Sequence, residues 1–413
     1  MKVPATILLL ALTCSLVTAS TTRPIVKATT GPRPYYLIDN LPEGALKTKL
    51  ESCADDRMVP SDFSIGHRGA ALQFPEHTRE SYVAAARTGA GIIECDVTFT
   101  KDKELVCRHA QNDLHTTTNI LLTPLAAKCF KPFTPYDPAT KSPATAECRT
   151  TDITLAEFKT LVGKMDGANE NALTVEEYVA GTPLFRTDLY TPPAKGGTLM
   201  THKESIELFK QLGVKMTPEA KEAVVEWPYD GFTRADFVQK IVDEYQALKV
   251  NASDVFIQSF ILGDLAYLTT SYPDGFGATA VYLDSADTIK DVPSKATLAS
   301  WKASGINIWA PPIWVLLQAK DGQIAPSQAA IDAKAVGLDL IAWSRERSGF
   351  MTNPDHGGWY YQTLNSIITR ESDILVTLHV LAQTLASEVS LPTGQARSRT
   401  TPTALAWREP NVN

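Results

Sequence analysis

Short runs of apolar and β-branched residues alternate along the chain with longer segments in which apolar residues recur every three or four positions. The short runs predict buried strands, and the longer segments predict amphipathic helices. Alternating strands and helices are typical of a parallel sheet, and a chain of 413 residues can hold a (β/α)8 TIM barrel. The predicted parallel strands lie at 63–67, 91–97, 214–217, 255–260, 278–283, 306–310 and 338–343, and clear helices lie at 78–88, 234–248 and 327–336.

Two predicted strands, 97–100 and 104–109, are separated only by a short turn. A parallel crossover needs about a dozen residues or more, so these strands are expected to form an antiparallel hairpin. The hairpin returns its last residue to the end at which the preceding parallel strand finished. Active sites of α/β barrels lie at the carboxyl ends of the strands. We therefore expect one site that contains His67, Glu94, Asp96 and His109.

The two ends of the chain differ from this pattern. Residues 20–60 are rich in Thr and Pro and show a single helical pattern, near 46–53, while residues 374–388 predict a helix near the other end. Closure of the barrel needs an eighth strand, which the C-terminal sequence supports poorly. The predicted organisation is an N-terminal lead-in at 20–60, a barrel at 61–385 and a divergent, disordered tail at 386–413.

Residues 1–19 combine a lysine at position 2, an apolar run at 7–12 and the small-residue pattern at 17–19. This combination predicts a secretory signal peptide that is cut after Ala19. A membrane anchor is the alternative, but the apolar run is shorter than the roughly 20 residues that span a bilayer. No later stretch predicts a transmembrane segment. We expect a secreted, extracellular protein, and the sequon at Asn251 is a candidate glycosylation site.

Five cysteines remain once the predicted signal peptide is removed. Cys129 and Cys148 flank a segment rich in Pro, Thr and Lys, and we predict that they form a disulfide that closes a surface loop. An odd number leaves at least one cysteine unpaired in an oxidising compartment. The sequence does not indicate the partners of Cys53, Cys95 and Cys107.

The net charge of −7 argues against a nucleic-acid partner, because proteins that bind phosphate backbones normally carry a basic surface. Any site for an anion must therefore be local. The segment 65–70 offers one, because His67 and Arg68 stand side by side between glycines at a strand end. His109, with its neighbour Arg108, offers a second imidazole at the same end. Two imidazoles that face a phosphate can act as general base and general acid near neutral pH.

Glu94 and Asp96 lie two residues apart on a predicted strand, so their side chains point to the same face. Their apolar neighbours indicate burial, and two buried carboxylates repel unless a cation neutralises them. Carboxylate oxygens suit Mg²⁺ or Ca²⁺. The alternative is an exposed strand face with solvated acids. A third carboxylate, Glu219, and a cation, Lys221, follow another predicted strand, although an ordinary helix start after Pro218 fits the spacing nearly as well.

Several short motifs follow one another along the chain: His67-Arg68-Gly69, Pro75-Glu76-His77-Thr78, Gly89-Ala90, Ile93-Glu94-Cys95-Asp96-Val97, Thr100-Lys101-Asp102, Leu105-Val106 leading to His109, Glu219-Ala220-Lys221, Gln258-Ser259-Phe260 and Trp343. In their order and spacing, these motifs resemble the glycerophosphodiester phosphodiesterase family and, more distantly, the spider-venom type of phospholipase D. The resemblance covers roughly residues 62–345. His77 departs from it where the family usually has Asn, and Ala110 where an Asp usually follows the second histidine.

The resemblance implies a (β/α)8 barrel and a role for each of these side chains. The divalent metal would be held by Glu94, Asp96 and Glu219, and acid–base work would fall to His67 and His109. Arg68 and Lys221 would bind the substrate phosphate. Glu76 would support the metal or an adjacent histidine, and Trp343 would have a supporting role.

These observations predict a secreted, metal-dependent phosphodiesterase that converts glycerophosphodiesters to glycerol 3-phosphate and an alcohol. One alternative is a phospholipase D-like enzyme acting on lysophospholipid or sphingomyelin, which needs an apolar rim such as residues 309–314 could supply. Another is a non-catalytic barrel that binds phosphodiesters. In each case the partner is a small or lipid-derived phosphodiester. The preferred head group, the choice between Mg²⁺ and Ca²⁺ and the oligomeric state stay open.

Overall fold

The structure is a computed structural model that describes residues 24–53, 56–183, 186–188, 191, 196–345, 350–352 and 357–385. The predicted signal peptide at 1–19 and the predicted tail at 386–413 lie outside the described residues. In the described part, no helix is long and apolar enough to cross a membrane.

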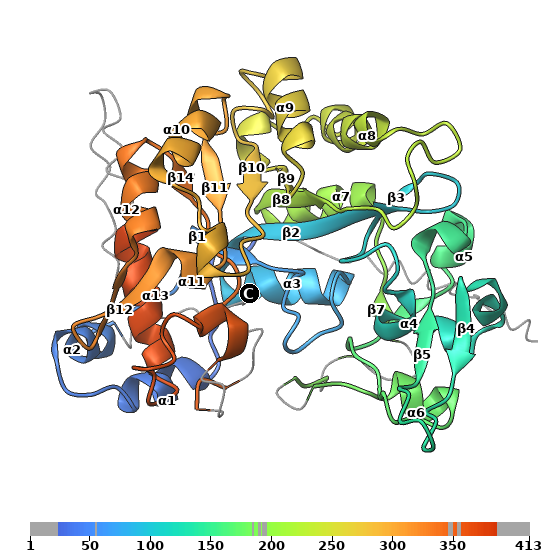
Figure 1. Cartoon of the computed structure of the whole chain (residues 1–413), viewed down its shortest axis with the longest axis horizontal. Helices are drawn as coiled ribbons and strands as arrows, with labels where there is room; N and C mark the ends of the chain where they lie inside the picture. Colours follow the sequence, from blue (N-terminus) through green and yellow to red (C-terminus); the bar gives the residue numbers. More distant parts are fainter. Residues whose placement is uncertain are drawn as a thin grey trace, which may run out of the picture.

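Seven parallel strands form the central sheet, which curls into a partly closed barrel with helices around it (Figure 1). The strand order is β1-β2-β8-β9-β10-β11-β14, and β3 pairs antiparallel with β2, so the predicted hairpin is confirmed. No described strand joins β14 to β1. The strands of this sheet are β1 (Ser61–Gly66), β2 (Ala90–Phe99), β3 (Leu105–Cys107), β8 (Lys215–Ala220), β9 (Gln258–Ser259), β10 (Val281–Leu283), β11 (Ile308–Ala310) and β14 (Asp339–Leu340).

Helices between consecutive strands bury their apolar faces against the sheet. Three of them begin at a threonine, Thr78, Thr201 or Thr233, whose side chain accepts a hydrogen bond from a backbone N–H of the first turn. The predicted helices near 78–88, 234–248 and 327–336 are confirmed, and so is the helix predicted at 374–388 as far as residue 385, where the described part of the chain ends. The longer helices are α3 (Arg79–Thr88), α7 (His202–Leu212), α8 (Arg234–Ala247), α9 (Leu262–Ser271), α10 (Lys295–Ala303), α12 (Gln328–Ala335) and α13 (Asp373–Leu385).

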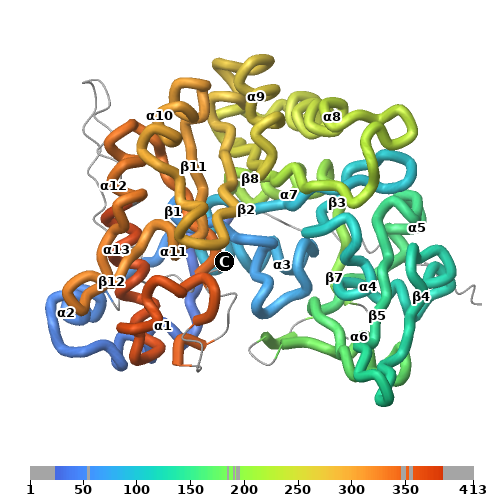
Figure 2. The backbone as a smooth tube through the Cα atoms, viewed as in Figure 1, coloured from blue at the N-terminus to red at the C-terminus, as the bar shows by residue number. Residues whose placement is uncertain are grey.

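The N-terminal lead-in contains two helices, α1 (Arg33–Asp39) and α2 (Ala45–Glu51), and both lie beside α13 (Figure 2). The Ser372 hydroxyl donates to the backbone oxygen of Asn40 at 3.1 Å. The prediction of a single helix in this segment was therefore wrong. A first turn tolerates proline because its N–H groups have no helical partner, and α1 starts within such a proline-rich stretch.

The described residues between positions 110 and 200 form a lobe at one side of the barrel, drawn in teal and green in Figure 1. The lobe has its own apolar core around Phe158 and Leu161. The predicted Cys129–Cys148 disulfide is present within it. The elements of the lobe are α4 (Leu114–Thr117), η1 (Ile120–Leu122), η2 (Pro124–Lys128), β4 (Lys131–Thr134), β5 (Thr145–Glu147), η3 (Thr150–Asp152), α5 (Leu155–Phe158), β6 (Val162–Gly163), α6 (Val175–Val179) and β7 (Gly197–Thr198).

The segment after β11 packs into the core instead of forming an exposed rim. Trp309, Ile313 and Trp314 are at most 2% exposed, so they cannot offer the apolar, membrane-facing surface that a lipid-specific enzyme needs. The remaining short elements are η4 (Ala252–Asp254), η5 (Ile289–Asp291), α11 (Ile313–Leu316), β12 (Leu317–Lys320), β13 (Gln323–Pro326) and η6 (Gly358–Tyr361).

Candidate active site

The loop between β1 and α3 places His67 and Arg68 directly after the carboxyl end of β1. Arg68 has a φ of 59° and Gly69 a φ of 84°, so the chain turns sharply here. A Cβ atom on Gly69 would lie 2.4 Å from the Ser81 hydroxyl oxygen, which explains the glycine. The turn aims the backbone N–H of Arg68 at Glu94, and it donates to Oε2 of that residue at 2.9 Å.

Glu94 and Asp96 point from β2 into the barrel, as their spacing predicts. They are 4% and 0% exposed, so a solvated strand face is excluded. Cys95, which points to the opposite face, forms a disulfide with Cys107 of β3. Burial raises the pKa of Glu94 well above its usual range, and the negative charges of Asp96 and Glu219 raise it further. Burial also raises the pKa of Asp96.

Glu219 lies beside Asp96 because these two residues are register partners on adjacent strands β2 and β8. The segment is a strand, so the alternative of a helix start after Pro218 is wrong. Lys221 Nζ lies 2.7 Å from Glu219 Oε1. Burial raises the pKa of Glu219 to about 7, because the opposing charge of Lys221 only partly offsets it and Asp96 adds a like charge.

Arg68 reaches into the site with its side chain held by Glu76. Its NH1 lies 2.9 Å from Glu76 Oε2, and its Nε lies 3.9 Å from Asp96 Oδ2. Burial alone would lower the pKa of Arg68, but the charges of Glu76 and Asp96 outweigh it and raise the pKa. Glu76 thus contacts Arg68. The resemblance had implied that Glu76 supports the metal or an adjacent histidine.

His67 and His109 lie at the same end of the barrel and differ in their charged surroundings. His67 Nε2 is 3.6 Å from Glu94 Oε2. His109 follows β3, where Arg108 N–H donates to the backbone oxygen of Asp96 at 2.8 Å. Burial lowers the pKa of His109 well below its usual range, and the nearby cations lower it further. His109 is therefore neutral at neutral pH and can accept a proton.

His77 is the main site residue to which the sequence assigned no role. Its Nε2 lies 2.8 Å from Asp96 Oδ2, and it forms with Glu94 and Asp96 a group whose ligand atoms all lie within 4.8 Å of one another. Burial lowers the pKa of His77 well below its usual range, and the charge of Arg108 adds to this effect. The one feature of the sequence that could have indicated this role is a histidine directly after Glu76, at a position where the resembled family usually has Asn.

The carboxylates fit a cation. Asp96 Oδ1 is buried and has no hydrogen-bond donor among the described residues. Glu219 lies across from Asp96 on the adjacent strand, so that two buried carboxyl groups of like charge come together. Two carboxyl groups that meet in this way need a proton or a metal ion between them. The donor set of carboxylates and one imidazole is suitable for a divalent ion.

Gln258 and Trp343 complete the surroundings. Gln258 Nε2 donates to Glu94 Oε1 at 2.6 Å, a contact that the sequence did not predict. Trp343 donates from Nε1 to the Ala310 backbone oxygen at 2.8 Å and packs against Phe260. The residue after Trp343, Ser344, has its hydroxyl oxygen 3.4 Å from His67 Nδ1. Trp343 thus fixes the position of the next residue, Ser344, which contacts His67.

The Cys95–Cys107 disulfide joins β2 to β3 directly behind the site. It closes a loop with a sequence separation of 12, and replacing both cysteines by alanine is expected to lower the free energy of unfolding by about 3 kcal/mol. Because His109 follows Cys107 closely, we also expect kcat to fall. Chemical denaturation and steady-state kinetics check these effects.

The matched control replaces Cys129 and Cys148, which form a disulfide of similar separation, 19, in the lobe. This variant should lose a similar free energy of unfolding and keep most of its kcat. An equal fall of kcat in both double variants would contradict the positioning role of the Cys95–Cys107 bond.

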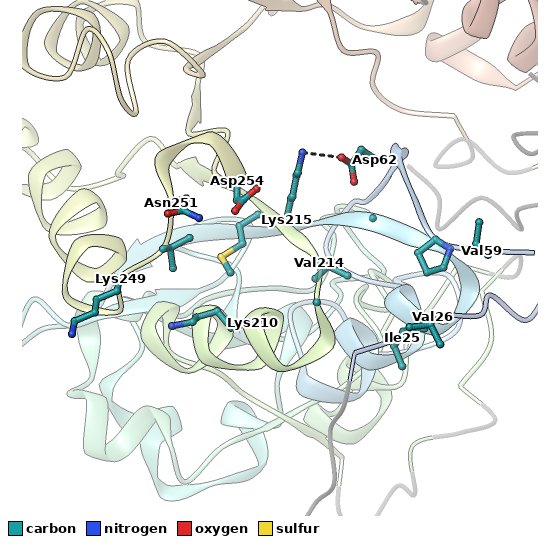
Figure 3. Close-up of a pocket in the computed structure, with 15 residues that line it drawn as sticks. Ile25, Val26, Val59, Asp62, Lys210, Val214, Lys215, Lys249, Asn251 and Asp254 are labelled. Carbon is teal, nitrogen blue, oxygen red and sulfur yellow. Dashed lines mark ion pairs between the residues drawn. The ribbon is translucent and has the colours of Figure 1, made fainter. Parts of the chain in front are cut away.

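A separate cavity of about 690 Å³ lies at the opposite end of the strands, where β1, β2 and β8 begin (Figure 3). Lys215 lines it and pairs with Asp62 at 2.8 Å. Asn251 also lines this cavity and is exposed, so it is accessible for the predicted glycosylation. None of the site residues described above lines the cavity.

Comparison with known proteins identifies a family that this sequence matches. The sequence model of the "Glycerophosphoryl diester phosphodiesterase family" matches residues 67–322. An Arthroderma benhamiae protein named "Extracellular protein" is 38% identical over 224 residues, which are 53% of this chain and 90% of that protein. A glycerophosphodiester phosphodiesterase of Arabidopsis thaliana is 26% identical over 307 residues, which are 70% of this chain and 74% of that protein.

Solved structures are also similar. One is an Oleispira antarctica phosphodiesterase in complex with the product sn-glycerol-3-phosphate, with a TM-score of 0.44, 18% identity and coverage of 76% of this chain and 96% of that chain. A glycerophosphodiester phosphodiesterase from Agrobacterium tumefaciens has a TM-score of 0.41, 15% identity and coverage of 67% and 85%. The family match spans more than half of the sequence, so the chain belongs to the glycerophosphoryl diester phosphodiesterase family and is a phosphoric diester hydrolase.

Proposed function

We propose that the chain is a secreted, metal-dependent phosphodiesterase that hydrolyses glycerophosphodiesters to glycerol 3-phosphate and an alcohol. The observation that carries this proposal is the convergence of imidazole, cationic and carboxylate side chains at the carboxyl ends of β1, β2, β3 and β8. The cations can bind a substrate whose charge lies on a single phosphate, and the carboxylates can hold a metal ion beside that phosphate.

Arg68 and Lys221 are the proposed phosphate ligands. The Arg68 Nε–H is buried and has no hydrogen-bond acceptor among the described residues, so it can donate to a phosphate oxygen. Lys221 lies on the neighbouring strand end and keeps its charge, because nearby Glu219 and Asp96 outweigh the effect of burial and raise its pKa. These two cations supply a local positive site on a chain whose net charge is −7.

Glu94, Asp96 and Glu219 are the proposed residues that hold a divalent metal, Mg²⁺ or Ca²⁺ if oxygen atoms alone bind it. Their support is the buried Asp96 Oδ1, which has no hydrogen-bond donor among the described residues, and the burial of Glu94 beside the like charges of Asp96 and Glu219. A bound divalent ion supplies Lewis-acid stabilisation of charge on the phosphoryl oxygens.

His109 is the proposed general base and His67 the proposed general acid. His109 is neutral because burial and nearby cations disfavour its charged form, so its ring can take a proton from a glycerol hydroxyl that attacks the phosphorus as the alcohol leaves. Water then opens the resulting cyclic phosphate to give glycerol 3-phosphate. His67 lies beside the Glu94 carboxylate, which stabilises positive charge on the imidazole, so it can give a proton to the departing alcohol. Ser344 contacts the other nitrogen of His67 and orients the ring.

Secretion and glycosylation at Asn251 complete the proposal. They are supported by two disulfides, which persist in oxidising compartments, and by the name of the Arthroderma benhamiae relative. Expression of the full sequence in a fungal or animal secretory host should release the protein into the medium. Protein that stays inside the cell with reduced cysteines would contradict secretion.

One assay separates the enzyme from the alternatives. The purified chain, loaded with a divalent metal, is given glycerophosphocholine, lysophosphatidylcholine or sphingomyelin in parallel, and the products are identified by mass spectrometry. We expect glycerol 3-phosphate and choline from the first substrate at the highest kcat/KM. Faster reaction with the lipids would favour the phospholipase D-like alternative. Binding of glycerophosphocholine without any hydrolysis would favour the non-catalytic barrel.

A further inference from the structure

We propose that His77 is a ligand of the divalent metal through Nε2, together with Glu94 and Asp96. This inference rests on the proposed function, because it concerns the same metal. It changes the expected chemistry of the site: a nitrogen donor shifts the preference from Mg²⁺ or Ca²⁺ towards ions such as Mn²⁺ that accept both imidazole and carboxylate.

The geometry of the three side chains carries the proposal. The ligand atoms of His77, Glu94 and Asp96 lie within 4.8 Å of one another, and the residues are 0%, 4% and 0% exposed. The His77 Nε2 atom is only 2.8 Å from Asp96 Oδ2. An imidazole nitrogen and a carboxylate oxygen that bind one ion lie about 3 Å apart, because each bond to the ion is about 2 Å long. Little movement is therefore needed for both atoms to bind an ion.

The backbone holds His77 in this place. His77 has a φ of 54°, a left-handed conformation that Asn and His adopt more readily than most residues, so this histidine fits a position where the family usually has Asn. Its N–H donates to the Arg68 backbone oxygen at 3.1 Å, and the Arg68 N–H donates to Glu94 at 2.9 Å. These two hydrogen bonds thus connect His77, through the backbone of Arg68, to the proposed metal ligand Glu94.

Tyr82 provides the second contact that a metal-bound histidine needs. Its hydroxyl oxygen lies 2.9 Å from His77 Nδ1, and its ring packs edge-on against Phe209. Histidines that bind metals usually donate their other ring N–H to an oxygen atom, which fixes the tautomer. With an ion at Nε2, the neutral ring would carry its proton on Nδ1, from which it would donate to the Tyr82 oxygen.

The charges around the cluster leave room for a divalent ion. Arg68 is paired with Glu76 and Lys221 with Glu219. In the described part of the chain, no lysine or arginine side-chain nitrogen comes closer than 3.9 Å to the two carboxylates of the cluster. Arg108, which lies behind His77, donates to the backbone oxygens of Cys107 and Glu76. Among the described residues, the two buried carboxylates thus lack a contacting lysine or arginine, and a divalent ion would neutralise them.

The test uses the full chain, stripped with a chelator and loaded with Mn²⁺, and records pulsed electron paramagnetic resonance. Directly bound imidazole gives a ¹⁴N modulation of the Mn²⁺ echo. We expect this modulation in the wild type, in His67→Asn and in His109→Asn, and its loss in His77→Asn. We also expect His77→Asn to bind Mn²⁺ at least about tenfold more weakly in calorimetry and to keep its circular dichroism spectrum.

The outcomes separate this inference from the proposed function. A wild-type chain that binds no Mn²⁺, Mg²⁺ or Ca²⁺ would overturn the metal site as a whole. A chain that binds Mn²⁺ without ¹⁴N modulation, or a modulation that persists in His77→Asn, would overturn the role of His77 and leave the enzyme intact. If His77→Asn fails to fold, wild-type protein labelled with ¹⁵N-histidine decides, because the ¹⁴N pattern must then give way to a ¹⁵N pattern.

Discussion

Replacing His67 or His109 by alanine is expected to lower kcat/KM for glycerophosphocholine by about 100-fold to 10,000-fold. Each replacement removes one proton-transfer group, while Arg68, Lys221 and the carboxylates stay in place to bind the substrate. The loss should therefore appear mainly in kcat. Both histidines lie at the rim of the buried cluster. Their replacement should therefore lower the free energy of unfolding by less than the replacement of a core side chain does. Steady-state kinetics and thermal unfolding measure the two effects.

His379→Ala is the matched control for these variants. His379 lies on α13, outside the candidate site, and is partly exposed. Its replacement should leave kcat/KM within about twofold of the wild type. Similar activity in all three alanine variants would contradict the assignment of His67 and His109.

The second large effect is expected from the metal site. Asp96→Asn should lower kcat by at least about 100-fold, because a metal ion contributes several kcal/mol to charge stabilisation and each 1.4 kcal/mol corresponds to a factor of ten. A chelator should abolish the activity of the wild type, and adding a divalent ion should restore it. The ion should not restore Asp96→Asn. Kinetics at several metal concentrations check both statements.

The stability of Asp96→Asn in the metal-free state separates catalysis from folding. Asp96 has a raised pKa and lies beside other carboxylates, so an amide relieves repulsion and the unfolding midpoint should not fall. Asp284→Asn is the control, because Asp284 is also a buried aspartate directly after a barrel strand, but its two oxygens accept from Trp309 Nε1 and Ala286 N–H. It should keep its metal dependence. Equal losses of activity in both variants would contradict a metal site at Asp96.

Much of the fold follows from the sequence because strands buried on both faces appear as unbroken apolar runs. The run at 91–97 predicted β2, and its alternation placed Glu94 and Asp96 on one face with Cys95 on the other. The short turn before β3 required a hairpin, which brought His109 back to the site. These predictions depend only on local periodicity and chain length, and the structure confirms them.

Other features depend on contacts that no local pattern specifies. The Cys95–Cys107 bond needs the register in which Val97 faces Cys107 across the hairpin, and the sequence alone allowed several registers. His77 approaches Asp96 only because a left-handed turn directs the loop back over the sheet. Helix α1 was missed because its prolines favour a loop unless they fall in a first turn. The C-terminal sequence supports an eighth, closing strand poorly, and residues 386–413 lie outside the described part of the chain.

The most direct measurement is a crystal structure of the chain grown with Mn²⁺ and glycerol 3-phosphate. We expect an anomalous peak within bonding distance of the Glu94 and Asp96 carboxylates. We also expect a phosphate group that contacts Arg68 and Lys221 and lies between the rings of His67 and His109. A phosphate bound at the opposite end of the strands, in the cavity beside Lys215, or a metal bound away from Glu94 and Asp96, would contradict the proposed site.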